Sequence, residues 1–262
     1  MESKYKKERN IKPVKRLTTR LVLWGCLVLC SIVCKASALP TSDTIITGAR
    51  LNFVENKGQW PTKVHFRTQM NNATCYLEDS CFTIITRSPI EAPATIAAAD
   101  RAILANSHAA RHFQGYNHHA YRMRFVGANR SATIMGKGLS EGYENYYLGN
   151  DSNLWASECR LFGCVEYRDL YPGINLKAYS TEHGLKYEYI VMPGANPELI
   201  LVEYDSISSL ATKDGNLIVS TSAGNVEELK PYVYQETHEG RISIEASYIT
   251  YGNRVHIAIG SY

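Results

Sequence analysis

The sequence lacks the short motifs that mark several common enzyme classes. It has no P-loop, no H-E-x-x-H zinc helix, no C-x-x-C pair and no G-x-G-x-x-G dinucleotide loop. Acidic pairs such as Glu141 with Glu144 have no matching partner, whereas general acid–base work needs two carboxyls that face one cleft. These absences argue against nucleotide-binding, redox and metal-hydrolase classes. We therefore predict a protein that is not an enzyme, with no catalytic residue, cofactor or metal site.

The sequence also lacks an apolar run long enough to span a bilayer. The run Leu21–Cys34 has 14 residues, and a spanning helix needs roughly 20. It follows a basic stretch and precedes the small residues Ala36-Ser37-Ala38, a pattern typical of a secretory signal peptide. We predict cleavage between Ala38 and Leu39, which makes residues 1–38 a signal peptide and residues 39–50 a flexible leader. The mature chain then has no membrane span and is exported to the periplasm, the cell surface or the medium.

An excess of basic residues is missing once the signal peptide is removed. Residues 1–38 carry nine of the 28 Lys and Arg and two of the 25 Asp and Glu. The remaining 224 residues hold 19 basic and 23 acidic residues, a formal charge of −4 in place of +3. Such a chain lacks the basic footprint of nucleic-acid binding, so we predict no nucleic-acid partner.

Cysteine is scarce in the mature chain. Three of the seven cysteines belong to the signal peptide, and the four that remain are Cys75, Cys81, Cys159 and Cys164. An even number in an exported chain permits disulfides, and the simplest pairing is local, Cys75 with Cys81 and Cys159 with Cys164. If residues 78–80 form a hairpin loop, Cys75 and Cys81 lie diagonally at a Cα separation of about 7–8 Å, near the limit for a bridge. Buried free thiols are the alternative.

What the sequence does contain is a rhythm of short strands. From Val165 to Tyr204, apolar residues recur at every second position between turn signals such as Tyr171-Pro172-Gly173. We predict a four-stranded antiparallel meander there, and further short strands that end with Val255–Ile259. Because no convincing βαβ unit interrupts them, the predicted fold class is an all-β, antiparallel β-sandwich-type domain.

One region breaks this rhythm. Residues 95–112 are rich in alanine, the best intrinsic helix former, but carry too few large aliphatic residues for a core-facing stripe. We expect one inserted helix or mobile loop at about residues 88–114. The chain from 51 to 262 is predicted as a single all-β domain, with two packed β subdomains that break near 136–142 as the alternative.

Several separated segments resemble a known family. In chain order they are Asn52–Trp60, Asn145–Asp151 with Trp155-Ala156, Asp169–Ile174, Leu185–Tyr187, Pro193–Ala195 and Glu228–Tyr232. They are similar to an uncharacterised N-terminal domain of large exported proteins of gliding, type IX-secreting bacteria, where it precedes SBBP-type β-propeller repeats and a gliding-motility-associated sorting domain. The resemblance covers nearly the whole mature chain and implies no catalytic or ligand residues. The chain stops about where the repeats would begin, so we expect an N-terminal unit that folds without further residues.

Tyrosine is the residue that links this pattern to function. Seventeen of the 18 tyrosines lie outside the signal peptide, and tyrosine is both a favoured strand residue and a frequent contact to carbohydrate or protein. We predict a non-catalytic exported cell-surface or secreted module for adhesion or surface assembly, with other surface proteins or glycans as partners. The alternative is a carbohydrate-binding or carbohydrate-active β-sandwich protein, with Tyr146 and Trp155 as ligand contacts.

Overall fold

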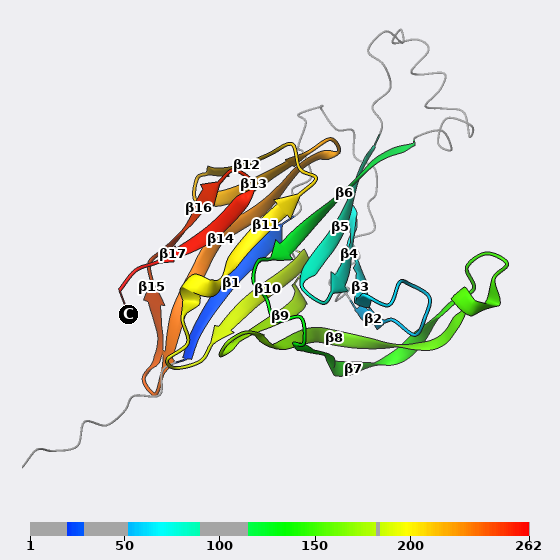
Figure 1. The fold of residues 1–262 in the computed structure, drawn as a ribbon, viewed down its shortest axis with the longest axis horizontal. Helices are drawn as coiled ribbons and strands as arrows, with labels where there is room; N and C mark the ends of the chain where they lie inside the picture. Colours follow the sequence, from blue (N-terminus) through cyan, green and yellow to red (C-terminus); the bar gives the residue numbers. More distant parts are fainter. Residues whose placement is uncertain (1–19, 29–51, 90–114, 182–183, 262) are drawn as a thin grey trace, which may run out of the picture.

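The computed structural model of the chain describes residues 20–28, 52–89, 115–181 and 184–261 (Figure 1). These ranges contain short 3-10 helices η2 (Ser152–Leu154) and η3 (Pro197–Leu199) among many strands. The strands are β1 (Arg20–Val28), β2 (Phe53–Glu55), β3 (Val64–Gln69), β4 (Ala73–Glu78), β5 (Cys81–Pro89), β6 (Tyr116–Phe125), β7 (Thr133–Tyr146), β8 (Ala156–Tyr171), β9 (Ile174–Thr181), β10 (Gly184–Val191), β11 (Leu201–Asp205), β12 (Ser209–Lys213), β13 (Asn216–Thr221), β14 (Gly224–Thr237), β15 (Gly240–Ile244), β16 (Ala246–Tyr251) and β17 (Arg254–Ile259).

Antiparallel pairing joins all of these strands into one sheet. The pairing can be followed in the order β16, β17, β11, β6, β5, β4, β3, β2, β8, β9, β10, β1, β14, β13 and β12. Two further strands attach to its sides, β7 to β8 and β15 to β14. The all-β antiparallel fold class is therefore confirmed.

The sheet folds over so that its two halves face each other. Phe82 on β5 contacts Tyr187 on β10 at a ring-centroid distance of 6.3 Å, and Phe125 on β6 contacts Tyr189 on β10 at 6.5 Å. Because β5 and β6 are hydrogen-bonded to each other and β10 to β9, these contacts cross between two layers. The arrangement is sandwich-like, as predicted.

Alternation along the strands fills the space between the layers. On β10, Leu185, Tyr187, Tyr189 and Val191 are all buried, which is the face that the sequence predicts for this run. Each such side chain contributes roughly 1.5–3 kcal/mol when it is fully removed from water. Several buried tyrosines keep a hydroxyl partner, as where Tyr167 donates to the backbone carbonyl of Glu78 at 2.9 Å, whereas the buried hydroxyls of Tyr121 and Tyr189 have none among the described residues. Most of the tyrosine in the body of the domain therefore serves packing.

The predicted meander forms only in part. Strands β8, β9 and β10 pair in succession, but the fourth strand, β11, pairs with β6 and β17 in the other layer, where Val202 stands opposite both Phe125 and Val255. The chain makes this crossing through η3, which begins after the N-cap Asn196. Alternation predicts a strand but not its partner, and this is where the sequence prediction fails.

The remaining fold expectations have mixed outcomes. Strand β7 runs without a break through residues 136–142, with a shift of register between Leu139 and Tyr143, and pairs with β8 on both sides of that shift. The terminal strand β17 pairs with both β16 and β11, so it lies inside the sheet. The helix or loop expected at 88–114 falls almost entirely on residues 90–114, outside the described residues.

Two features of Figure 1 place the sites discussed below. The distal parts of β7 and β8 run away from the body as a long two-stranded projection with η2 near its tip; we call residues 139–160 the arm. Within the body, away from the arm, β1 lies between β10 and β14 and pairs with both.

Candidate functional site

The base of the arm is set by a tight turn after β2. The side chain of Asn56 accepts hydrogen bonds from the backbone N–H of Gly58 at 3.0 Å and of Trp60 at 3.2 Å, and it donates to the carbonyls of Trp60, Pro61 and Val64 at 3.0, 3.1 and 2.8 Å. Gly58 has φ of +115°, a value that L side chains rarely adopt. The amide of Asn56 thus bonds to both ends of the turn, and the Gln59 side chain adds a bond from the N–H of Lys57 at 2.7 Å.

Gln59 and Trp60 connect this turn to the arm. The buried amide of Gln59 donates to the carbonyl of Glu55 at 2.9 Å and to Sγ of Cys159 at 3.4 Å. The Trp60 ring packs edge-on against Tyr146 at a centroid distance of 5.1 Å. The hydroxyl of Tyr146 donates to Glu144 and accepts a hydrogen bond from Arg67 at 3.1 Å. The segment Asn52–Trp60 therefore has a structural task, which is to hold the arm.

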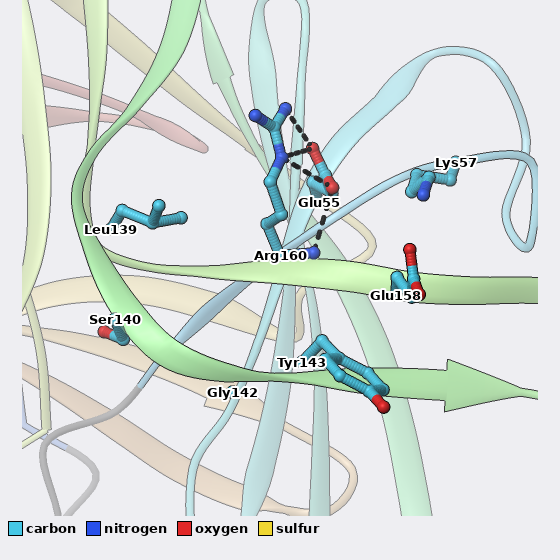
Figure 2. A pocket seen from close by; sticks show the side chains of 8 residues that line it. All are labelled: Glu55, Lys57, Leu139, Ser140, Gly142, Tyr143, Glu158 and Arg160. Atoms are coloured by element: carbon cyan, nitrogen blue, oxygen red, sulfur yellow. Dashed lines mark hydrogen bonds and ion pairs between the residues drawn. The ribbon is translucent and has the colours of Figure 1, made fainter.

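A shallow cleft of about 670 Å³ lies between this turn and the arm (Figure 2). Figure 2 shows the ion pair of Arg160 and Glu55 at its centre, with Leu139 on one side and Lys57 on the other. The residues that line the cleft are Glu55, Lys57, Leu139, Ser140, Gly142, Tyr143, Glu158 and Arg160.

The central ion pair is locked. Arg160 donates to Glu55 from Nε at 2.9 Å and from Nη2 at 2.7 Å, and its backbone N–H adds a further bond at 2.9 Å. Burial raises the pKa of Glu55, but the hydrogen bonds and charge of Arg160 outweigh burial and hold that pKa below its ordinary value. A general acid needs the opposite shift, so this carboxylate is suited to fixing the arm or to accepting hydrogen bonds.

The cleft contains one pattern that the sequence analysis did not single out. Residues 138–142, Gly-Leu-Ser-Glu-Gly, match the G-x-S-x-G of serine hydrolases, in which the serine sits on a sharp turn from strand to helix. Here the pattern lies within strand β7, and the hydroxyl of Ser140 bonds to the Asn52 side-chain oxygen at 3.3 Å. The pattern was available from spacing alone, but its setting is not that of a nucleophile elbow.

The structure separates the two candidate ligand contacts. Tyr146 is half-buried behind Trp60, whereas Trp155 is 46% exposed on the arm. Trp155 packs edge-on against Tyr147 at a centroid distance of 5.7 Å, and Tyr147 is 63% exposed. The exposed aromatic pair is therefore Tyr147 with Trp155. The sequence alone could not show which tyrosine of the doublet Tyr146-Tyr147 is the exposed one. Asp151 caps the intervening η2 by accepting a hydrogen bond from the N–H of Asn153 at 3.0 Å.

The arm carries an unusual share of exposed apolar side chains. In the body, residues of this kind are scattered over separate strands. Those of the arm are Leu139, Tyr143, Tyr147, Leu148, Leu154 and Trp155. A set of exposed aromatic and aliphatic residues gathered on one projecting element is typical of an interaction surface.

The four cysteines are free thiols, so the predicted disulfides do not form in the structure. Cys75 stands opposite Ile84 in the β4–β5 hairpin, three positions beyond Cys81. Cys159 and Cys164 lie five residues apart on the single strand β8, which separates them by roughly 16 Å along its axis. Both separations exceed what a disulfide spans. The alternative of free thiols is the one that the structure contains, and Cys75, Cys81 and Cys159 are buried.

The remaining predictions concern the cleavage site, metal binding and membrane spans. Ala38 and Leu39, the predicted cleavage site, lie outside the described residues. Over the ranges that are described, no group of three or more His, Cys, Asp or Glu is arranged to hold a metal ion. Within the same ranges, no helix has the length and apolar character needed to cross a membrane.

Comparison with known proteins gives one match. Neither the curated proteins nor the solved structures contain a match to the chain. A family model described as a domain of unknown function, DUF7948, matches residues 53–262. This match begins at β2, continues through the arm and ends after β17, so that β1 is the one described strand outside it. The chain therefore belongs to the DUF7948 family.

Proposed function

We propose that the chain is an exported, non-catalytic binding module of the cell surface or the extracellular space, and that the arm is its contact surface. The observation that carries this proposal is the exposed apolar set on the arm, headed by Tyr147 and Trp155. Tyrosine and tryptophan dominate the energy of protein interfaces because they offer large area at a low entropic cost. The resemblance to the N-terminal domain of exported, gliding-associated surface proteins supports the same role in adhesion or surface assembly.

The construction of the arm supports binding rather than catalysis. The cations at its base are held in place, since Arg160 pairs with Glu55 and Lys57 donates to the carbonyl of Ser157 at 2.9 Å. A rigid base that presents exposed aromatic side chains lowers the ordering cost of association. An arm of this kind suits a partner with an extended contact surface, such as another surface protein.

The proposal is tested by the double variant Tyr147→Ser/Trp155→Ser. We expect its binding to surface material of the producing cells to fall at least about tenfold, the loss typical of interface anchors. Labelled protein and cells that lack the gene give the binding curve by flow cytometry. Because both side chains are exposed, the melting temperature should stay close to that of the wild type.

The matched control is Tyr251→Ser. Tyr251 is 66% exposed, like Tyr147, but lies at the end of β16 in the body. Its substitution should leave binding unchanged. Equal losses from the control and the double variant, or no loss from either, would show that the arm is not the contact surface.

The second candidate function is carbohydrate binding. It is favoured by Tyr143, which is exposed in the cleft beside Glu158 and Arg160, because sugars stack on aromatic faces and bond to charged groups. A glycan array separates the two candidates. Selective binding that is lost in Tyr143→Ala and kept in Tyr251→Ser would assign the cleft to glycans, whereas no selective glycan favours a protein partner.

A further inference from the structure

The position of β1 in the sheet points to a site in a different part of the molecule from the arm. Six residues of β1 have Cα partners on β10, from Leu21 opposite Val191 to Cys26 opposite Lys186. Eight have partners on β14, from Arg20 opposite Glu236 to Val28 opposite Glu227. Both pairings are antiparallel. Strand β1 therefore connects two strands that stand roughly 9–10 Å apart, twice the spacing of neighbouring strands.

The register of β1 matches the core on both sides. Leu23 stands opposite Tyr189 on β10 and Val233 on β14, and both partners are buried. Leu21 stands opposite the buried Val191, and Leu27 opposite the buried Glu228. Directly opposite residues in antiparallel strands share a face of the sheet. Position 25 on the same face is a glycine opposite the buried Tyr187, so the site takes an apolar or small residue at alternate positions.

Both ends of β1 stand opposite an acidic residue of β14. Arg20 stands opposite Glu236, and Val28 stands opposite Glu227 at the other end. A strand that occupies this place meets a carboxylate at each end. Glu236 also pairs with Arg241 on β15 at 3.1 Å, so a basic residue at the position opposite Glu236 shares this carboxylate with Arg241.

The same segment is the apolar centre of the predicted signal peptide. If residues 1–38 are removed on export, the body loses β1 and leaves two unpaired rows of backbone groups in the middle of the sheet. Unpaired strand edges of this kind recruit another strand, which is the basis of β-strand addition between chains.

We propose that the opening between β10 and β14 is a strand-accepting site. Residues 20–28 fill it in the full chain. After their removal, an extended segment of a partner protein fills it, with apolar or small residues at every second position and a basic residue opposite Glu236. The partner strand lies antiparallel to both neighbours. This site is independent of the arm and of the proposed binding function there.

Strand exchange in the full chain tests this. A protease site placed at residues 40–44 allows the folded protein to be cut without removing β1. The probe is a labelled peptide of residues 20–28 with a charged solubilising tail. We expect the cut protein to bind the peptide at least about tenfold more tightly than the uncut protein, in which the tethered strand competes at a high effective concentration. Amide hydrogen exchange should slow at residues 186–191 and 227–236 when the peptide binds.

Three control peptides separate strand addition from apolar adhesion. A Leu23→Pro peptide removes a central N–H and cannot continue the pairing, so its binding should fall at least about tenfold, while Leu23→Ala should bind more tightly than the proline peptide. A scrambled peptide of the same composition should not bind. Equal uptake by cut and uncut protein, equal binding of the proline peptide, or closure of the opening by a second copy in a dimer that excludes the peptide would overturn the proposal.

Discussion

At the scale of single residues, Glu228 shows what strand alternation can reveal. It shares a face of β14 with the buried Val226, is fully buried, and accepts hydrogen bonds from the hydroxyls of Tyr187 at 2.6 Å and Tyr204 at 2.5 Å. In sequence it reads as half of an acidic pair, yet its alternation with Val226 already places it on the inner face. Its two partners come from β10 and β11, and that meeting follows only from the folded layers.

Burial gives Glu228 a pH-dependent effect on stability. Burial raises the pKa of this carboxyl above its ordinary value of 4.5, against the hydrogen bonds of Tyr187 and Tyr204, which lower it. Because the folded-state pKa is the higher one, the unfolded chain releases its proton first as the pH rises. The wild type should therefore lose stability from about pH 4.5 upward until the folded-state pKa is passed.

The variant Glu228→Gln should not show this loss. Its free energy of unfolding relative to the wild type should rise with pH and reach a gain of roughly 1–3 kcal/mol at pH 8. Urea unfolding at pH 4.5, 6 and 8, followed by fluorescence, measures the difference. The exposed Glu239→Gln serves as the control and should give no such trend. A difference between Glu228→Gln and wild type that is flat across this pH range would contradict the assignment.

The cysteines give a second prediction at this scale. Burial raises the pKa of Cys81 to about 12, with the carboxylate of Glu78 as the next cause, and Cys75 is fully buried. Since the thiolate is the reactive form, iodoacetamide at pH 8 should leave Cys75 and Cys81 unmodified in the native protein and label the half-buried Cys164 sooner. After unfolding without a reductant, intact mass should show every cysteine labelled. A deficit of two labels would reveal a disulfide.

At the scale of elements, local pairings were predictable and distant ones were not. The hairpin of β4 and β5 and the succession of β8, β9 and β10 follow from alternation and turn signals between neighbours in sequence. The pairing of β11 with β6 was not accessible, because alternation specifies a face and not a partner. The length of β7 was missed because Gly136, Gly138 and Gly142 read as breaks, whereas the strand shifts register there and continues.

The turn after β2 should be sensitive to one substitution. Replacing Asn56 by Ala removes five hydrogen bonds to backbone groups, so we expect a loss of about 2–4 kcal/mol in the free energy of unfolding. Because this turn places Trp60 against Tyr146, tryptophan emission should also shift to the red. Thermal melting and fluorescence spectra measure both effects. Lys57→Ala, at the exposed neighbour, should change stability by less than about 0.5 kcal/mol, and a similar loss from both variants would show that Asn56 has no special part.

At the scale of the whole molecule, the two predicted roles of residues 20–28 meet. As part of a signal peptide this segment leaves the chain, and as β1 it completes the sheet between β10 and β14. Composition identifies the first role, because a basic stretch, an apolar run and small residues follow one another. The second role requires the fold, since it depends on two strands more than 150 residues further along the chain. Processing would therefore change both the charge of the protein and the completeness of its sheet.

Processing is open to a direct test with Ala36→Leu/Ala38→Leu, because signal peptidases require small residues at these positions. The exported wild type should begin at Leu39 and carry a formal charge of −4, whereas the variant should retain residues 1–38 and a charge of +3. Intact mass of the exported and cell-associated protein measures the difference, and Ala49→Leu should be processed normally. The unprocessed variant keeps β1 in place, so it should also take up less of the labelled 20–28 peptide than the processed wild type. If the exported wild type retains residues 1–38, the predicted cleavage is wrong and β1 is a permanent strand of the sheet.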